Sequence, residues 1–238
     1  MGGGLLQLVA YGAQDIYLTG NPQITFFKVV YRRHTNFAME AIENVFNGNP
    51  GFGKRVTAQI SRNGDLIHRI YVQVQLPGLT GSSLWADYIG LRVLADVEIE
   101  IGGQRIDKHY SQWLYIWNEL SLPVGKRAAW KKMVGSEGTG LNEIGQPAGT
   151  TNLFVPLEFW FNRNVGLALP LIALQYHEVK INIDFETLAN CLQYASGGST
   201  APTTSTSVAS DLVKASLWVD YIYLDTDERR RFAQLSHE

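Results

Sequence analysis

The sequence predicts an all-β fold, an eight-stranded antiparallel jelly-roll sandwich with one or two short helices in a long inter-strand insertion. Apolar residues alternate with polar residues in several segments, which places one face of each strand in a core. Helical segments do not alternate with strands, so a parallel α/β sheet is not expected. The 238 residues are 45% hydrophobic and 18% charged, which favours a folded protein over a disordered chain.

Strands are expected along most of the chain. The alternation is clearest where Val97, Ile99 and Ile101 interleave with Glu98 and Glu100. The eight expected strands occupy residues 24–32, 37–45, 56–60, 66–67 with 70–76, 97–101, 153–159, 179–186 and 212–224. Eight is the number of strands in a jelly roll of two packed antiparallel sheets.

Two dipeptides predict tight turns. Asn63-Gly64 follows the strand 56–60 and favours a type I′ hairpin to the next strand, because both central residues of that turn need positive φ. Gly102-Gly103 predicts a second tight turn, which joins 97–101 to the short run 104–106. Local, antiparallel pairing is therefore expected at both places.

The expected helices and long loops all lie after residue 107. Residues 108–120 and 126–134 have helical character, and 135–151 and 195–210 have the composition of loops. If consecutive strands alternate in direction, both long loops leave the sandwich at the same end. The tail from 225 carries an Asp-x-x-Glu signal that predicts the start of a short helix.

Composition excludes several classes of function. The formal net charge of -2 provides no overall attraction to nucleic acid or anionic lipid, so neither direct nucleic-acid binding nor membrane insertion is expected. The N-terminus resembles neither a secretory signal nor a membrane anchor. Because Cys191 is the single cysteine, an internal disulfide and a multi-cysteine metal site are both excluded.

No catalytic, cofactor-binding or metal site is expected from the motifs of the chain. The five histidines lack the paired spacing of a metal site. Glu98 and Glu100 share one face of a strand, as a glycosidase pair would, but the alternation places that face in solvent. Trp113 and Trp117 lie one helical turn apart, which fits docking of the helix onto the sandwich better than stacking on a sugar.

Seven runs of sequence resemble one protein family in order and spacing. They are LQLVAYGAQD (6–15), YLTGNPQITFFK (17–28), YRR (31–33), QISRNGD (59–65), IGGQRID (101–107), LALPLIALQYHE (167–178) and WVDY (218–221). The chain thereby resembles the major capsid proteins of nucleocytoplasmic large DNA viruses of the algal and giant-virus type. Because the runs span nearly the whole chain, the resemblance does not depend on a single motif.

The resemblance implies a structural protein, not an enzyme, with two tandem jelly rolls in each subunit. Three subunits would form a pseudo-hexagonal capsomer that tiles an icosahedral shell. On this interpretation residues 1–23 are an N-terminal arm, 24–224 the first jelly-roll domain, and 225–238 a connector toward a second jelly roll not present in this chain. Either the chain is partial, which is favoured, or it is an unusual single-roll relative.

The expected partners are further copies in a homotrimer, neighbouring capsomers and minor capsid proteins, with no cofactor. The expected location is the outer shell of the virion, after assembly in the host cytoplasm. Candidate assembly contacts are Leu5, Leu6, Arg32 and Arg33.

Two other classes of function remain open at this point. One is a carbohydrate-binding jelly-roll module for host attachment, which would use the long loops and Trp113 or Trp130. The other is a cupin-like or glycan-cleaving enzyme, which would need clustered metal ligands or a carboxylate pair that the sequence does not convincingly provide.

Overall fold

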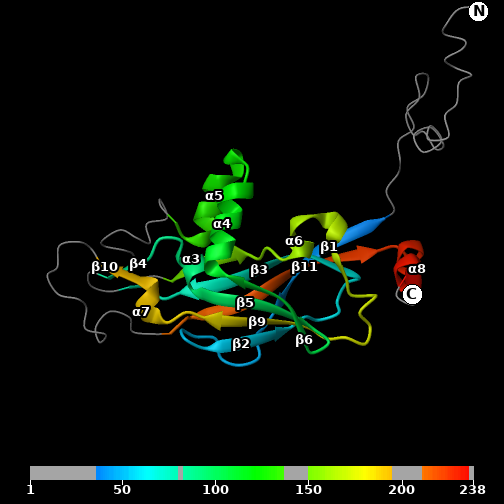
Figure 1. Ribbon diagram of the computed structural model, residues 1–238, viewed down its shortest axis with the longest axis horizontal. Coiled ribbons are helices and arrows are strands. Elements are labelled where there is room, and N and C mark those ends of the chain that lie inside the picture. The colour runs from blue at the N-terminus through cyan, green and yellow to red at the C-terminus, as the bar shows by residue number, and fades with distance from the viewer. Residues whose placement is uncertain (1–35, 80–82, 137–149, 195–210, 236–238) are drawn as a thin grey trace, which may run out of the picture. The chain divides into compact units, whose positions relative to one another are not determined.

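The structure, a computed structural model, describes residues 36–79, 83–136, 150–194 and 211–235. The chain divides into two compact units, Met1–Asn36 and Phe37–Glu238, and nearly all described residues lie in the second. Figure 1 shows strands of this second unit stacked in layers, with helices around them. The expected strand 24–32 falls outside the described residues.

The strands of the second unit form two main sheets and a small ribbon, and all their pairings are antiparallel. The first sheet contains, side by side, β1 (Phe37–Asn44), β11 (Lys214–Leu224), β3 (Leu66–Leu76) and β7 (Thr151–Pro156), with β8 (Leu169–Pro170) also paired to β3. The second sheet contains, side by side, β2 (Arg55–Gln59), β9 (Val179–Phe185), β5 (Leu94–Ile101) and β6 (Gln104–Tyr110). The ribbon pairs β10 (Leu192–Tyr194) with β4 (Ser83–Trp85).

The strand order is that of a jelly roll. Among the described residues, eight strands have five or more residues; counted along the chain, they lie in the order 1-8-3-6 in one sheet and 2-7-4-5 in the other. The predicted all-β sandwich is therefore confirmed. One strand of the second sheet differs from the prediction. The expected short run 104–106 is a full strand, Gln104–Tyr110.

Short helices occupy the connections between strands. They are α3 (Ile89–Arg92), α4 (Ser111–Ser121), α5 (Val124–Val134), α6 (Trp160–Arg163), the 3-10 turn η1 (Val165–Leu167), α7 (Leu188–Cys191) and α8 (Thr226–Leu235). Figure 1 shows α4 and α5 projecting together from one side of the strands. The predicted helix 108–120 begins three residues later than expected, because the chain continues to pair with β5 up to the Asp96–Tyr110 pair.

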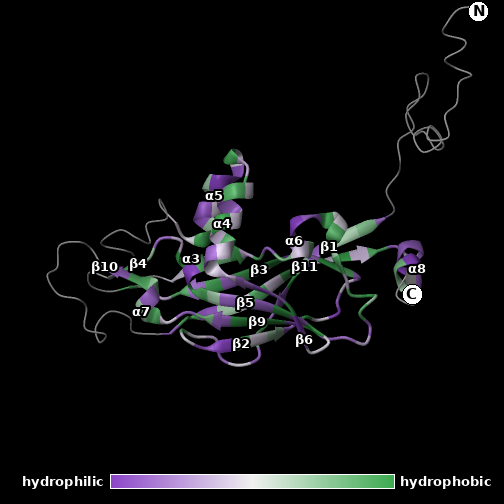
Figure 2. Ribbon diagram, in the orientation of Figure 1, coloured by the Kyte–Doolittle hydropathy of each residue, from purple (hydrophilic) through white to green (hydrophobic). Residues whose placement is uncertain are grey.

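The core lies between the two sheets and is made by the alternating residues of their strands. Val72 and Val74 of β3 and Ile181 and Ile183 of β9 have 0% of their surface exposed. Burial of each such side chain contributes about 1.5–3 kcal/mol to folding. Figure 2 shows the resulting mixture of hydrophobic and hydrophilic positions along the strands. The period of two in the sequence thus identified the inward faces correctly.

Of the two predicted tight turns, one is confirmed and one is wrong. Gly102 and Gly103 have φ of 62° and 84° and join two paired strands, as expected. Asn63-Gly64 does not close a hairpin, because β2 and β3 belong to different sheets. Glycine is needed at position 64 for another reason: a Cβ there would lie 2.8 Å from the Cβ of Tyr221.

The two long loops lie almost wholly outside the described residues, so the expectation that they open at one end of the sandwich stays a prediction. The strands that follow them agree with it. Thr151, the first residue of β7, pairs with Leu76, and Lys214, the first residue of β11, pairs with Gln75. Both strands therefore enter the first sheet beside the last residues of β3.

Helix α8 follows β11 and is held against the barrel. The predicted helix start is confirmed, with the Thr226 amide donating to Oδ1 of Asp225 at 2.7 Å. Asp65, whose side chain is only 7% exposed, accepts from Nε of Arg229 at 2.9 Å and from the Leu224 amide at 2.8 Å. This carboxylate fixes the direction in which the chain leaves the last strand.

Candidate functional site

The four candidate assembly contacts, Leu5, Leu6, Arg32 and Arg33, lie outside the described residues. The candidate sites that the structure describes lie in the second unit. Three of its surface features are unusual in burial or charge: a pocket beneath α4 and α5, the apolar tip of those two helices, and a charged cluster on β5. Sequence alone pointed to Trp130 of the pocket only for the carbohydrate-binding alternative, and to Glu98 of β5 only as one of a disfavoured carboxylate pair.

Helices α4 and α5 form a hairpin in which α5 contacts β7 of the first sheet and α4 contacts β5 and β6 of the second. Arg127 of α5 links the two helices, because its Nη2 lies 3.0 Å from the backbone oxygen of Glu119 and 3.3 Å from its Oε2. Leu114 and Trp130 are the large buried side chains of α4 and α5, at 0% and 4% exposure. Gly135 ends α5 with φ of 74°, the left-handed conformation typical of a helix C-terminus.

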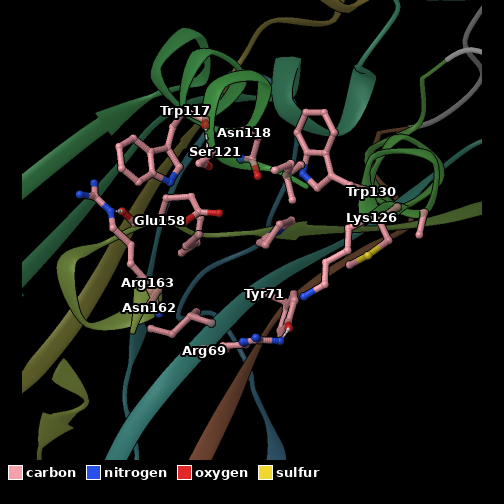
Figure 3. Close-up of a pocket in the computed structure, with 16 residues that line it drawn as sticks. Arg69, Tyr71, Trp117, Asn118, Ser121, Lys126, Trp130, Glu158, Asn162 and Arg163 are labelled. Atoms are coloured by element: carbon pink, nitrogen blue, oxygen red, sulfur yellow. Dashed lines mark hydrogen bonds between the residues drawn. The ribbon is translucent and has the colours of Figure 1, made fainter. Parts of the chain in front are cut away.

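A pocket of about 450 Å³ lies between this hairpin and the elements β3, β7 and α6 (Figure 3). That volume is in the usual range of small-molecule and side-chain binding pockets. Its apolar walls include Ile70, Leu122, Met133 and Leu157. Its labelled polar and aromatic side chains in Figure 3 are Arg69, Tyr71, Trp117, Asn118, Ser121, Lys126, Trp130, Glu158, Asn162 and Arg163.

Positive charge predominates in the pocket. Arg69, Lys126 and Arg163 face a single carboxyl group, that of Glu158. Burial raises the pKa of Glu158, and the nearby Arg163 guanidinium opposes that rise. The guanidinium of Arg163 lies 4.2 Å from the ring centre of Trp117, a cation–π contact that leaves its charge beside the pocket.

The predicted packing role of Trp113 and Trp117 is correct only in part. Their rings are 5.7 Å apart, and Trp117 is half-buried in the pocket wall. Trp113 remains 37% exposed, because the inward positions of α4 are those of Leu114 and Asn118. The two tryptophans thus lie beside the buried stripe of the helix and not within it.

The tip of the hairpin exposes apolar side chains. Leu120, near the end of α4, is 82% exposed, and Val124, the first residue of α5, is 87% exposed. Ile116, one turn earlier in α4, is 48% exposed. Single exposed apolar residues are common on protein surfaces, but two so exposed at one tip mark a surface suited to contact with another molecule.

A charged cluster covers the outer face of β5. Glu98 is 6% exposed and contacts Nη2 of Arg55 at 2.7 Å, Nζ of Lys108 at 2.9 Å and Nη1 of Arg105 at 3.5 Å. Hydrogen bonding to Lys108 is the largest cause that lowers the pKa of Glu98. The prediction of a solvated face was therefore wrong for Glu98, because cations from β2 and β6 cover it.

Two of the histidines have structural contacts, His68 with Phe161 of α6 and His109 with Phe159, which precedes α6. His68 Nδ1 lies 3.1 Å from the backbone oxygen of Phe161, and His109 stacks on Phe159 at 4.8 Å. Burial lowers the pKa of His109.

Within the described ranges, no group of three or more His, Cys, Asp or Glu residues could hold a metal ion. No helix in those ranges has the length and apolar character to cross a membrane.

Comparison with known proteins identifies close relatives. Residues 25–225 match the family model described as "Major capsid protein N-terminus". The chain is 60% identical to the major capsid protein of Pyramimonas orientalis virus and 50% identical to that of Paramecium bursaria Chlorella virus 1, over its whole length in both cases. It covers 57% and 52% of those relatives, so it spans about half the length of the curated proteins it matches.

Solved structures agree with the sequence comparison. VP54 of PBCV-1 matches 88% of this chain with a TM-score of 0.73 at 45% identity, and the chain covers 48% of it. The Faustovirus major capsid protein matches 94% of the chain with a TM-score of 0.70, and the chain covers 60% of it; at 17% identity it supports the fold alone. The comparisons do not support the carbohydrate-binding or enzymatic alternatives. The chain belongs to the family of viral major capsid proteins, a family of structural proteins, and corresponds to the N-terminal part of its members.

Proposed function

We propose that this chain is the first jelly-roll part of a subunit that self-assembles into trimeric, pseudo-hexagonal capsomers of the icosahedral outer shell of a large DNA virus. The observation that carries the proposal is its 60% identity, over the whole chain, to a viral major capsid protein. The jelly-roll strand order supports it, because a compact sandwich with a deep core is a rigid block for a lattice.

The proposed mechanism is geometric and needs no chemical step. Rigid sandwiches pack side by side, bury apolar surface between subunits and use charge complementarity to fix their register. The exposed apolar side chains of Leu120 and Val124 are the kind of surface that such contacts bury. Neighbouring capsomers and minor capsid proteins are the proposed partners, and direct contact with nucleic acid is not proposed because the chain has a net charge of -2.

The parts of the chain have separate proposed roles. Residues 1–23 would act as an arm that orders on a neighbouring subunit through Leu5 and Leu6, and Arg32 and Arg33 would add polar contacts. Residues 24–224 would form the first jelly roll. Residues 225–238 would connect to a second one, and the link between Asp65 and Arg229 would set the direction of that connection. Assembly is proposed to take place in the host cytoplasm.

The mass of the purified product of the whole gene tests this proposal, measured by light scattering. The expected product is about twice the length of this chain, and the expected particle contains three copies. A monomer at every protein concentration would overturn the proposal of a trimeric building block. Deletion of residues 2–6 should weaken assembly of capsomers into larger particles and leave the melting temperature unchanged. Unaltered assembly would exclude the arm from the contact.

A further inference from the structure

The pocket beneath α4 and α5 contains a buried polar group that lacks a partner. Nε1 of Trp130 has no hydrogen-bond acceptor among the described residues, although the side chain is 96% buried. Buried N–H groups are nearly always paired, since an unpaired one costs about 1–3 kcal/mol. Figure 3 shows the indole nitrogen on the edge of the ring that faces the other labelled side chains of the pocket. An acceptor supplied from within the pocket would remove that cost.

The charges around the pocket favour an anionic acceptor. Lys126 makes no ion pair in the part of the chain that the structure describes, and its side chain lines the pocket opposite Glu158. Arg69 has a hydrogen bond of 3.5 Å to the Tyr71 hydroxyl, and the carboxyl groups near it are Glu158 in the pocket and Asp220 of β11 outside it. Three cations with these two carboxyl groups leave a positive excess that one further carboxylate would neutralise.

The walls of the pocket favour a ligand that also has an apolar part. Ile70, Leu122, Met133 and Leu157 line it together with the side chains of Trp117 and Trp130. A free inorganic anion would leave these walls in contact with water, whereas an apolar side chain next to a carboxylate would cover them. Leu120 and Val124, which flank the pocket residues Ser121 and Leu122 in the chain, add exposed apolar side chains.

We propose that this pocket binds an acidic peptide segment, with a glutamate or aspartate carboxylate directed at Lys126 and Arg69 and an adjacent apolar side chain between Trp117 and Trp130. A backbone carbonyl or the carboxylate of the segment accepts from Trp130 Nε1. That the segment belongs to a neighbouring shell protein rests on the proposed function, but the binding itself does not.

Isothermal titration of the purified subunit with two synthetic peptides tests the proposal. The probe is the acetylated and amidated tripeptide leucyl-glutamyl-leucine, and the matched control peptide has glutamine in place of glutamate. Because carboxylate contacts with cations and a buried N–H are charge-assisted, the acidic peptide should bind about tenfold more tightly than its amide counterpart.

Three variants locate the binding. Lys126→Gln should weaken binding of the acidic peptide about threefold, because the lysine is exposed. Trp130→Phe keeps most of the ring and removes the N–H, so it should weaken binding of both peptides about fivefold. Lys132→Gln is the matched control: it removes the same charge from an exposed site on the same helix outside the pocket, and should leave the affinity unchanged.

The outcomes distinguish failure of the pocket proposal from failure of the capsomer proposal. Equal affinity for the two peptides, no heat of binding at about 5 mM peptide, or equal losses in Lys126→Gln and Lys132→Gln would overturn the proposal. Acetate binding as tightly as the acidic peptide would do the same, since it would show a site for small anions alone. A subunit that forms trimers but does not bind the peptide refutes the pocket proposal and leaves the capsomer proposal standing.

Discussion

Replacing Glu98 by glutamine should destabilise the protein well beyond the effect expected of an ordinary strand substitution. The Glu98 side chain is 7% exposed and contacts Arg55, Lys108 and Arg105 within 3.5 Å. Glutamine fills the same volume but provides a neutral acceptor to these cations. Loss of hydrogen bonds to charged groups costs about 1.5–3 kcal/mol, and the half-exposed guanidinium of Arg55 reduces the cost through solvent screening. The expected loss is about 2 kcal/mol.

Thermal unfolding measures this loss, and Glu100→Gln is its matched control. Glu100 lies on the same face of β5, two residues away, and its carboxylate accepts one hydrogen bond of 3.3 Å, from Asn182. A loss of about 2 kcal/mol lowers the melting temperature of a protein of this size by about 4–8 °C. Glu100→Gln should shift it by less than about 2 °C. Equal shifts in the two variants would refute the argument that cations from β2 and β6 make Glu98 distinct.

The dependence on pH gives a second check of the same reasoning. Since Lys108 and Arg55 lower the pKa of Glu98, its contribution to stability is present above the unfolded pKa of about 4.3 and is lost as the pH falls through the lower folded pKa. The difference in free energy of unfolding between the original protein and Glu98→Gln should therefore be largest near neutral pH and shrink in acid. A difference that grew in acid would contradict the ion pairs.

Three further predictions concern the close approach at Gly64, the buried thiol and helix α8. Gly64→Ala should lower the free energy of unfolding by about 1–3 kcal/mol, because its Cβ would lie 2.8 Å from a carbon of β11. At Gly125 in α5 an added Cβ has no neighbour within 4 Å, so Gly125→Ala should stabilise the protein by up to about 1 kcal/mol. Equal melting temperatures of the two variants would contradict this. Burial raises the pKa of Cys191 to about 12, so at neutral pH iodoacetamide should alkylate the native thiol far more slowly than the thiol of the urea-unfolded chain, and equal rates would exclude burial as the cause. Asp65→Asn should weaken the hold on α8 and speed tryptic cleavage at Arg229; unchanged cleavage would show that this ion pair does not hold the helix.

The features that sequence predicted well are those set by local patterns. Alternation along β5 and β9 reports which side chains face the core, because the period of two follows from strand geometry alone. The turn at Gly102-Gly103 was also predictable from a local pattern. The two strands that it joins are adjacent in sequence and pair with each other. Alternation cannot supply the order of the strands within the sheets, which the structure gives.

The errors concern contacts between distant parts of the chain. Asn63-Gly64 has the composition of a hairpin turn, but packing sends the strands on either side of it into different sheets, and the glycine is required by Tyr221, 157 residues later. The pocket is a similar case. Arg69 and Tyr71 occupy the polar positions of an alternating strand, and only the fold shows that helices α4 and α5 cover them.

The outer face of β5 and the α4–α5 hairpin differ in whether their polar groups have partners and their apolar side chains are buried. On β5, the carboxylate of Glu98 is neutralised by cations of its own chain, so contact with a neighbour would gain little there. On the α4–α5 hairpin, Leu120 and Val124 are more than four-fifths exposed, and Trp130 Nε1 lacks an acceptor among described residues. An interface gains most free energy where the isolated subunit leaves apolar surface in water and polar groups unpaired. Assembly contacts of this chain are therefore expected at the helical hairpin and not at the outer face of the second sheet.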